Sequence, residues 1–410
     1  MVVEQAGTAA FVEPTTRVPP KWIAFFSLAV AGIFVGWYGP LQILLARQAE
    51  AISPGGKENL LALVAGVGAA FSMVANPVWG ALSDRTTSRF GRRIPWLAWG
   101  AALGAVSLLV LGRASSTLML IAGWCLVQTV LNAPFAALSA AIPDQVPAAQ
   151  RGAAGGYFGV AQIFGVVLGT GLAVAGGYLA CAAFVLLSAI PYVLMRRDRV
   201  LAKVDRPPFR LGQFLGAFWL SPRRYPDFGW AWLTRFLMNL GNAIALLYLL
   251  FFLKDAVHLA NPEGGVFILT AINAVALLLS VMVAGVWSDR VGKRRVFVMW
   301  SGLIMAVATF LLAGWPTWTG AIIAAVILGL GFGAYTSVDF ALLTQVLPAA
   351  VDRGKDLGVF NIANALPQVL APVLAAPIVT RLGGYSTLYA VAAVFGLLGA
   401  VLVYQIKSVR

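Results

Sequence analysis

The sequence predicts an all-α integral membrane protein, with twelve transmembrane helices arranged as two six-helix bundles. Three observations lead to this fold class. The 410-residue chain is 60% hydrophobic and only 11% charged, whereas soluble domains carry about 25% charged residues. Its apolar runs are about 20 residues long, the length that crosses a hydrocarbon core of about 30 Å. A charged, glycine-containing turn occurs twice between such runs, 205 residues apart when its aspartates are aligned.

The predicted helices follow one another through short connections, and the longest polar interval divides them six and six. Their ranges are 22–46, 57–83, 94–113, 117–142, 152–175, 177–195, 229–253, 263–287, 296–314, 319–345, 357–380 and 384–405. The predicted domains are a tail (1–21), a first bundle (22–195), a linker (196–228), a second bundle (229–405) and a second tail (406–410). Within the linker, residues 209–220 are amphipathic and aromatic, as expected of a helix that lies along the membrane interface.

The net charge of +14 reflects membrane topology rather than nucleic-acid binding. With the N-terminus inside, 23 of the 29 Lys and Arg fall in cytoplasmic segments. Positive charge is enriched in cytoplasmic loops, so we expect both termini in the cytoplasm. The predicted setting is a bacterial inner membrane, where the chain contacts lipid, binds no nucleic acid and works as a monomer.

The composition offers neither a metal site nor the groups of an enzyme. Cys125 and Cys181 lie inside apolar runs, and the single histidine, His258, falls in an outer loop. Metal motifs need several such ligands at defined spacing, and an active site needs a nucleophile, a base or a metal that converge. We therefore expect no cofactor and no enzymatic activity.

The repeated turn carries a resemblance to a known family. The first copy reads Gly80-Ala-Leu-Ser-Asp-Arg85 and continues to Gly91-Arg-Arg93, and the second spans residues 285–295. These residues resemble the signature of the major facilitator superfamily between helices 2 and 3 and its repeat between helices 8 and 9. The resemblance implies two six-helix halves that transport a solute by alternating access, with the substrate site between them.

A longer stretch resembles one group within that superfamily. The residues from Ser83 to Trp96, together with Asn76-Pro77 and Asn132-Ala-Pro-Phe135, are similar to the glycoside–pentoside–hexuronide cation symporters and the sucrose–proton symporters. This resemblance implies transport of a sugar or glycoside. Melibiose-type members carry acidic cation ligands on helices 2 and 4, where this chain has the uncharged residues Ser72, Asn76 and Asn132. Since sodium prefers carboxylate oxygens, we do not expect sodium coupling through these positions.

The two turns are predicted to act as gates. Asp84 ends a helix, where a carboxylate opposes the helix dipole, so it needs a partner. The resemblance implies that Asp84 docks against helix 11, and the repeat suggests that Asp289 docks toward helix 5. The alternative, a loop that only orients the helices during insertion, explains the arginines but not the paired aspartates. The predicted gating residues are Asp84, Arg85, Arg89, Arg92, Arg93, Asp289, Arg290, Arg294, Arg151 and Arg353.

Arg235 and Asp339 are the charges that the pattern places inside spans. Each lies about six residues from the predicted inner end of its helix, or roughly 9 Å at 1.5 Å per residue. Intramembrane charges are costly and are usually paired or functional. We expect the two to pair, with Asp339 as the proton carrier; a static structural pair is the alternative.

Polar and aromatic side chains recur at helical spacing and predict a polar cavity. Spacings of three and four residues place amides on one helix face. The predicted substrate-binding residues are Trp37, Tyr38, Trp124, Gln128, Asn132, Asn239, Asn242, Tyr335, Asn361, Asn364 and Gln368. Interhelical hydrogen bonding is the alternative use of such amides. The amides favour a proton-coupled sugar symporter, and the alternative function is a proton-antiport exporter of amphipathic molecules.

Overall fold

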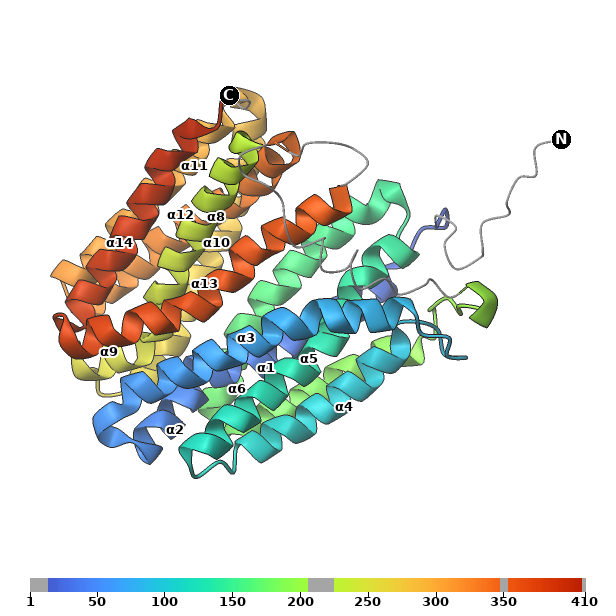
Figure 1. Ribbon diagram of the computed structural model, residues 1–410, viewed down its shortest axis with the longest axis horizontal. Helices are drawn as coiled ribbons and strands as arrows, with labels where there is room; N and C mark the ends of the chain where they lie inside the picture. Colours follow the sequence, from blue (N-terminus) through green and yellow to red (C-terminus); the bar gives the residue numbers. More distant parts are fainter. Residues whose placement is uncertain (1–13, 206–224, 347–352, 408–410) are drawn as a thin grey trace. The chain divides into compact units, whose positions relative to one another are not determined.

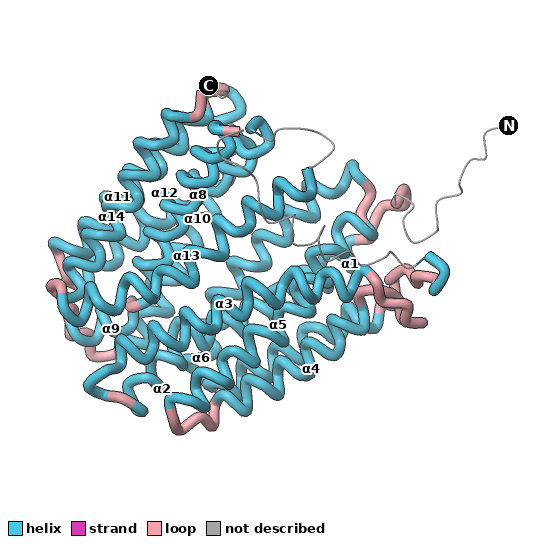
Figure 2. The backbone as a smooth tube through the Cα atoms, viewed as in Figure 1, coloured by secondary structure: helices cyan, strands magenta, loops and turns pink. Residues whose placement is uncertain are grey.

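The computed structural model describes residues 14–205, 225–346 and 353–407, which form helices joined by short loops (Figure 2). The helices of the first part are α1 Pro20–Gly39, α2 Leu45–Ile52, α3 Lys57–Asp84, α4 Ile94–Leu111, α5 Thr117–Gln145 and α6 Ala148–Leu194. Those of the second part are α8 Pro226–Leu247, α9 Leu249–Asp255, α10 Pro262–Val291, α11 Arg294–Gly314, α12 Trp318–Val346, α13 Arg353–Arg381 and α14 Gly384–Leu402. The predicted interfacial helix at 209–220 lies outside the described residues.

The described helices account for the twelve predicted membrane spans. Ten helical segments are individually long and apolar enough to cross a membrane, and α8 with α9, bent by 44°, forms an eleventh. α6 has 47 residues, so at 1.5 Å per residue it is about 70 Å long, more than twice the hydrocarbon thickness. Gly177 interrupts it with φ 60° and ψ −147°. This conformation favours glycine over other residues. The break at Gly177 divides α6 into two helices, so α6 supplies two spans.

The chain divides into two compact units, each a bundle of long helices (Figure 1). Unit 1 comprises Met1–Leu44 and Phe71–Phe209, and unit 2 comprises Leu45–Ala70 and Arg210–Arg410. The segment from Leu45 to Ala70 therefore packs with the helices of unit 2, although it precedes most of unit 1 in sequence. The predicted bundle limits at 195 and 229 stay a prediction.

Helix starts follow the local sequence. Proline occupies the first turn of α1, α4, α8 and α10, where its missing N–H costs nothing. Ser116 caps α5 by accepting a hydrogen bond from the Met119 N–H at 3.3 Å, and Asn261 caps α10 through the Gly264 N–H at 3.0 Å. These caps satisfy backbone donors that have no partner within the helix.

Unit 1 is built on close packing of α1 against α6. A Cβ atom at Gly165 would lie 2.6 Å from the Ala31 carbonyl oxygen, so only glycine allows the two backbones to approach this closely. After Gly39, the residues Pro40–Leu44 form a π-helical segment. The regular α-helix thus ends within the Gly-Trp-Tyr-Gly-Pro sequence of residues 36–40.

In unit 2, α12 packs on α10 and α11, and α14 packs on α8 and α11. Ion pairs join the segment Leu45–Ala70 to α9. Lys57 Nζ lies 2.7 Å from Asp255 Oδ2 and 3.1 Å from Glu50 Oε1, and Lys254 Nζ lies 2.6 Å from Glu50 Oε2. The Tyr385 hydroxyl donates to Asp255 Oδ2 at 2.9 Å. Because Glu50, Lys57 and Asp255 each bind two partners, these side chains form a network rather than isolated pairs.

Candidate functional site

The central polar site of unit 2 is formed by Arg235, Asn239, Asp339 and Asn364, which we call the arginine–aspartate cluster. The Arg235 guanidinium forms an ion pair with the Asp339 carboxylate. Its Nε donates to Asn364 Oδ1 at 2.9 Å. Asn239 Nδ2 donates to the same oxygen at 3.1 Å and to the Arg235 carbonyl at 2.8 Å. Helices α8, α12 and α13 therefore meet through one hydrogen-bonded group.

The cluster is well shielded inside the bundle. The side chains of Arg235 and Asp339 are 16% and 9% exposed. Two charges in such surroundings are tolerated because they neutralise each other, and removing one partner of a buried pair typically costs about 3–5 kcal/mol. Any event that neutralises Asp339 therefore leaves Arg235 in need of another acceptor.

The other predicted substrate residues of unit 2 belong to the same three helices and differ in their exposure. Tyr335 is buried one helical turn before Asp339 on α12, and Asn242 is half-buried one turn after Asn239 on α8. Gln368 is exposed on α13. Asn361 belongs to the same helix, but its side chain lies outside the described residues.

In unit 1 the corresponding polar group is uncharged, and we call Ser72, Asn76 and Asn132 the amide cluster. Asn132 is buried, and its Nδ2 donates to Ser72 Oγ at 2.7 Å and to the Gln128 carbonyl at 2.6 Å. Its Oδ1 accepts from Asn76 Nδ2 at 3.1 Å. The three uncharged residues at the positions where melibiose-type permeases carry acidic ligands thus contact one another. The Asn132 side-chain oxygen already accepts a hydrogen bond from Asn76.

The predicted aromatic residues of unit 1 divide into two groups. Tyr38 stacks on Phe34 with ring centroids 5.8 Å apart, and Trp37 packs edge-on against Phe135 at 5.3 Å. Both are half-buried. Trp124 is completely buried and therefore packs within the bundle, whereas Gln128 is half-buried one turn further along α5.

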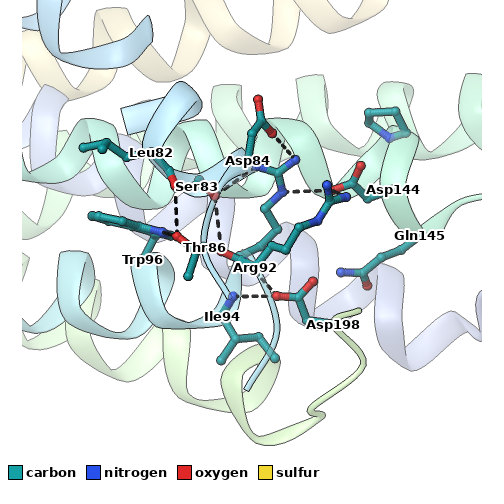
Figure 3. A network of polar contacts seen from close by, with 12 residues as sticks. Leu82, Ser83, Asp84, Thr86, Arg92, Ile94, Trp96, Asp144, Gln145 and Asp198 are labelled. Atoms are coloured by element: carbon teal, nitrogen blue, oxygen red, sulfur yellow. Dashed lines mark hydrogen bonds and ion pairs between the residues drawn. The ribbon is translucent and has the colours of Figure 1, made fainter. Parts of the chain in front are cut away.

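The first repeated turn forms a dense ionic network in unit 1 (Figure 3). Arg93 Nη2 lies 2.6 Å from Asp84 Oδ1, and its Nε lies 2.8 Å from Asp144 Oδ2. Arg92 Nη2 reaches the same Asp144 oxygen at 2.9 Å. Burial by itself would lower the pKa of Arg93, but Asp144 and Asp84 outweigh it and raise the pKa. Asp84 thus has its partner within its own turn, and Asp144 joins that turn to the end of α5.

Asp198 supports the same turn from the segment after α6. Its Oδ2 accepts hydrogen bonds from the backbone N–H groups of Arg93 and Ile94, the latter at 3.0 Å (Figure 3). It therefore caps the first turn of α4, where a carboxylate also favours the helix dipole. Burial nevertheless raises the pKa of Asp198, because desolvation outweighs these donors.

The remaining predicted gating residues are placed as follows. Arg89 lies over the Phe90 ring at 4.8 Å, and Arg85 is half-buried at the end of α3. Arg151 donates to the carbonyls of Val146 and Pro143 at 3.1 and 3.3 Å, and so caps the end of α5. In the second turn Arg290 is exposed and Arg294 half-buried, while the side chains of Asp289 and Arg353 lie outside the described residues.

Sequence reasoning missed three residues of these sites. Asp144 follows Pro143 directly, and Asp198 is the acid within an Arg-rich segment; an acid among many bases could have marked Asp198 as a partner. Arg295 of the second turn donates to the Ile406 carbonyl at 2.6 Å. Asp144 is 51 residues from its partner Arg93, and Asp198 is 104 residues from its partner Ile94. Local spacing could therefore not reveal either contact.

Solved structures of transporters share the fold of this chain. A crystal structure of the nucleoside transporter NupG matches with a TM-score of 0.72 and 13% identity, over 94% of this chain and all of that one. A bacterial homologue of the human lysosomal transporter Spinster, inward-facing and unoccupied, matches with a TM-score of 0.67 and 15% identity, over 94% and 95% of the two chains. At these identities the likeness concerns the fold alone.

Curated relatives match shorter stretches. Multidrug resistance protein MdtL of Shewanella oneidensis is 29% identical over 147 residues, which are 36% of this chain and 37% of that protein. Myo-inositol transporter 3 of Cryptococcus neoformans var. grubii is 25% identical over 141 residues, 34% of this chain and 24% of that protein. The chain thus matches well under half the length of either relative.

The family model of the Major Facilitator Superfamily matches residues 22–280 and 255–409, which together cover nearly the whole chain. The match agrees with the repeated turns, the twelve spans and the transporter fold described above. Transporters of this kind move small molecules and perform no enzymatic chemistry. The chain is therefore a multi-pass integral membrane protein that belongs to the Major Facilitator Superfamily of secondary transporters.

Proposed function

We propose that this chain is a proton-coupled symporter of a small polar solute, a sugar or glycoside, that works by alternating access. The observation that carries the proposal is the arginine–aspartate cluster. An ion pair inside a membrane bundle is expensive and marks ion or proton pathways. Asp339 is the member of the cluster that can accept a proton.

The hydrogen bonds of the cluster suggest how proton and solute are coupled. Protonation of Asp339 removes the charge that holds Arg235, and Arg235 shares the Asn364 oxygen with Asn239. Once Arg235 loses its carboxylate, its donors and the Asn364 amide are available to solute hydroxyls. Solute binding would then favour the protonated state, and by linkage protonation would favour solute binding to the same extent.

The solute class follows from the donors and acceptors. Amides on α8, α13 and the amide cluster of unit 1 can pair with hydroxyl groups, and aromatic rings such as Trp37 and Tyr38 can pack on a sugar ring. The resemblance of the Ser83–Trp96 stretch to glycoside and sucrose symporters supports the same class. One curated relative, Myo-inositol transporter 3, is named for a polyol. We propose that coupling does not use sodium, because the amide cluster lacks a carboxylate.

The turn between α3 and α4 is proposed to control access, with the cytoplasm on its side of the membrane. Asp84 is 55% exposed although it is paired with Arg93, so it can exchange that partner for a helix N-terminus in another conformation. One arrangement makes the contact and the other breaks it, as a two-state switch requires. The second turn, with Asp289, is proposed to act in the same way.

An exporter of amphipathic molecules by proton antiport is a second candidate. It is favoured by the aromatic group of unit 1, in which Phe34, Trp37, Tyr38 and Phe135 contact one another. The name of the relative MdtL points the same way. In an exporter, this aromatic group would bind the apolar rings of the substrate, whereas the amides would only form hydrogen bonds between helices.

Proteoliposomes containing the purified protein test these candidates. An inward proton gradient should drive labelled mono- or disaccharide uptake above equilibrium, and a protonophore should abolish that accumulation. If no sugar accumulates but an amphipathic cation such as ethidium is moved against its gradient, the exporter is correct. Movement of neither class would contradict both candidates, with protein-free vesicles as the control.

A further inference from the structure

Unit 1 contains a cavity of about 280 Å³ that the transport function does not explain. It lies where three segments meet: the residues before α1, the end of α5 and the segment that follows α6. Thr15, Thr16, Trp22, Gln145, Arg197 and Arg199 line it. Because α1 begins, α5 ends and α6 ends at this level, the cavity lies at one surface of the membrane.

The polar groups around this cavity are hydrogen-bond donors. Gln145 Oε1 accepts from Trp22 Nε1 at 2.9 Å and from the Tyr192 hydroxyl at 3.4 Å. These two bonds occupy the acceptor end of the Gln145 side chain, whose amide NH₂ is a further donor group. The Thr15 and Thr16 hydroxyls add two further groups able to donate.

Two arginines give the cavity a positive charge, and the acid between them is directed elsewhere. Arg197 and Arg199 line the cavity, whereas the Asp198 carboxylate accepts from the Arg93 and Ile94 N–H groups. The Asp198 charge is thus used at α4, and Arg197 and Arg199 are the charged residues among those that line the cavity.

A donor-rich, cationic cavity of this size suits a phosphate group. Arginine forks match phosphate oxygens better than any other side chain. Pockets for drug-sized ligands begin at about 300 Å³, so this cavity fits a headgroup rather than a larger molecule. Basic pockets between membrane helices recognise anionic lipid headgroups.

We propose that this cavity binds the phosphate group of an anionic phospholipid. The bound headgroup would join the N-terminal segment to the segment that follows α6. That second segment also holds the turn of α3 and α4, because the Arg92 N–H donates to the Arg199 carbonyl at 3.2 Å. Lipid binding here therefore steadies the support of the Asp84–Arg93 network. The proposal is independent of the solute that the protein transports.

Native mass spectrometry of delipidated protein in detergent tests the proposal, with short-chain phosphatidylglycerol as the probe. The double variant Arg197→Gln/Arg199→Gln should bind this lipid about thirtyfold more weakly, because each basic group near a headgroup contributes about 1 kcal/mol. The control, Lys293→Gln/Lys407→Gln, removes two exposed charges outside the cavity and should bind within about twofold of the wild type. Thermal unfolding without lipid verifies that both variants are folded.

Two further arms identify the source of the phosphate. Phosphatidylcholine should bind more weakly than phosphatidylglycerol, and inorganic phosphate at equal concentration should not displace the lipid. Displacement by inorganic phosphate would overturn the lipid as the ligand and point to a soluble phosphate. Equal binding of phosphatidylglycerol to the wild type and to the Arg197/Arg199 variant would overturn the site itself.

Discussion

The two units place different chemistry in their polar interiors. In unit 2, Arg235 and Asp339 form an ion pair within a network of amides. In unit 1, the amide cluster is uncharged and its central residue, Asn132, uses both ends of its side chain in hydrogen bonds. A repeated architecture therefore carries an unequal pair of sites. Of the two clusters, only the one in unit 2 contains a carboxylate that can take up a proton, so we propose that proton coupling occurs there. The amide cluster of unit 1 can contribute structure and solute contacts without a change of charge.

The largest effect is expected from Asp339→Asn. The substitution preserves size but removes the charge and the proton that we assign to coupling. Accumulation of solute should fall to the equilibrium level, and the pH dependence of uptake should disappear. Counterflow exchange between equal pH values should persist if the fold is intact, and it is measured in the same proteoliposomes. An Asp339→Asn protein that still accumulates solute with unchanged pH dependence would show that the pair is static.

A smaller effect is expected from Asn132→Ala in unit 1. It leaves Asn76 and Ser72 without their partner, and an unsatisfied buried polar group costs about 1–3 kcal/mol. Thermal stability should fall accordingly, and uptake should decrease less than about tenfold while its pH dependence is retained. Asn239→Ala is the matched amide control in unit 2, where altered pH dependence is expected because Asn239 shares an acceptor with Arg235.

Sodium provides the control for the amide cluster. Uptake by the wild type should be the same when sodium is replaced by choline. A requirement for sodium that Asn132→Ala abolishes would contradict the contrast between the two units, because it would make the amide cluster a cation site.

The smallest effect is expected from Asp198→Asn, which tests a half-buried acid of unit 1 that we do not assign to coupling. Burial raises the pKa of Asp198 in the folded protein, so its protonated form is favoured by folding. Its contribution to stability is present below the ordinary aspartate pKa and is lost as pH rises through the raised value. Relative to the wild type, Asp198→Asn should therefore become more stable as pH increases from about 4.

Thermal unfolding in detergent, measured at a series of pH values from about 4 upward, gives the difference in stability between Asp198→Asn and the wild type. The pH profile of transport should be unchanged, in contrast to Asp339→Asn. A transport profile that shifts with Asp198→Asn would assign a coupling function to unit 1 as well.

The sequence alone determined the fold class of this protein. Runs such as 94–113 and 117–142 are long enough to cross a bilayer, and the bilayer leaves a backbone little choice but a helix. The same reasoning found Arg235 and Asp339, because a charge inside an apolar run stands out in any window. Their contact was expected as a hypothesis. Asn364 was not expected as a further partner of Arg235, because that bond exists only after three separate helices have packed.

Only the tertiary structure decided which residues complete each site. Asp144 and Asp198 are far from Arg93 in sequence, and nothing local identifies Arg93 as their partner. Their role depends on where α5 ends and on the path of the segment after α6. The pairing of Lys57 with Asp255, and with it the inclusion of Leu45–Ala70 in unit 2, likewise depends on long-range packing. Hydrophobic patterning dictates that helices form, but ion-pair partners are selected by distances that exist only after the helices have packed.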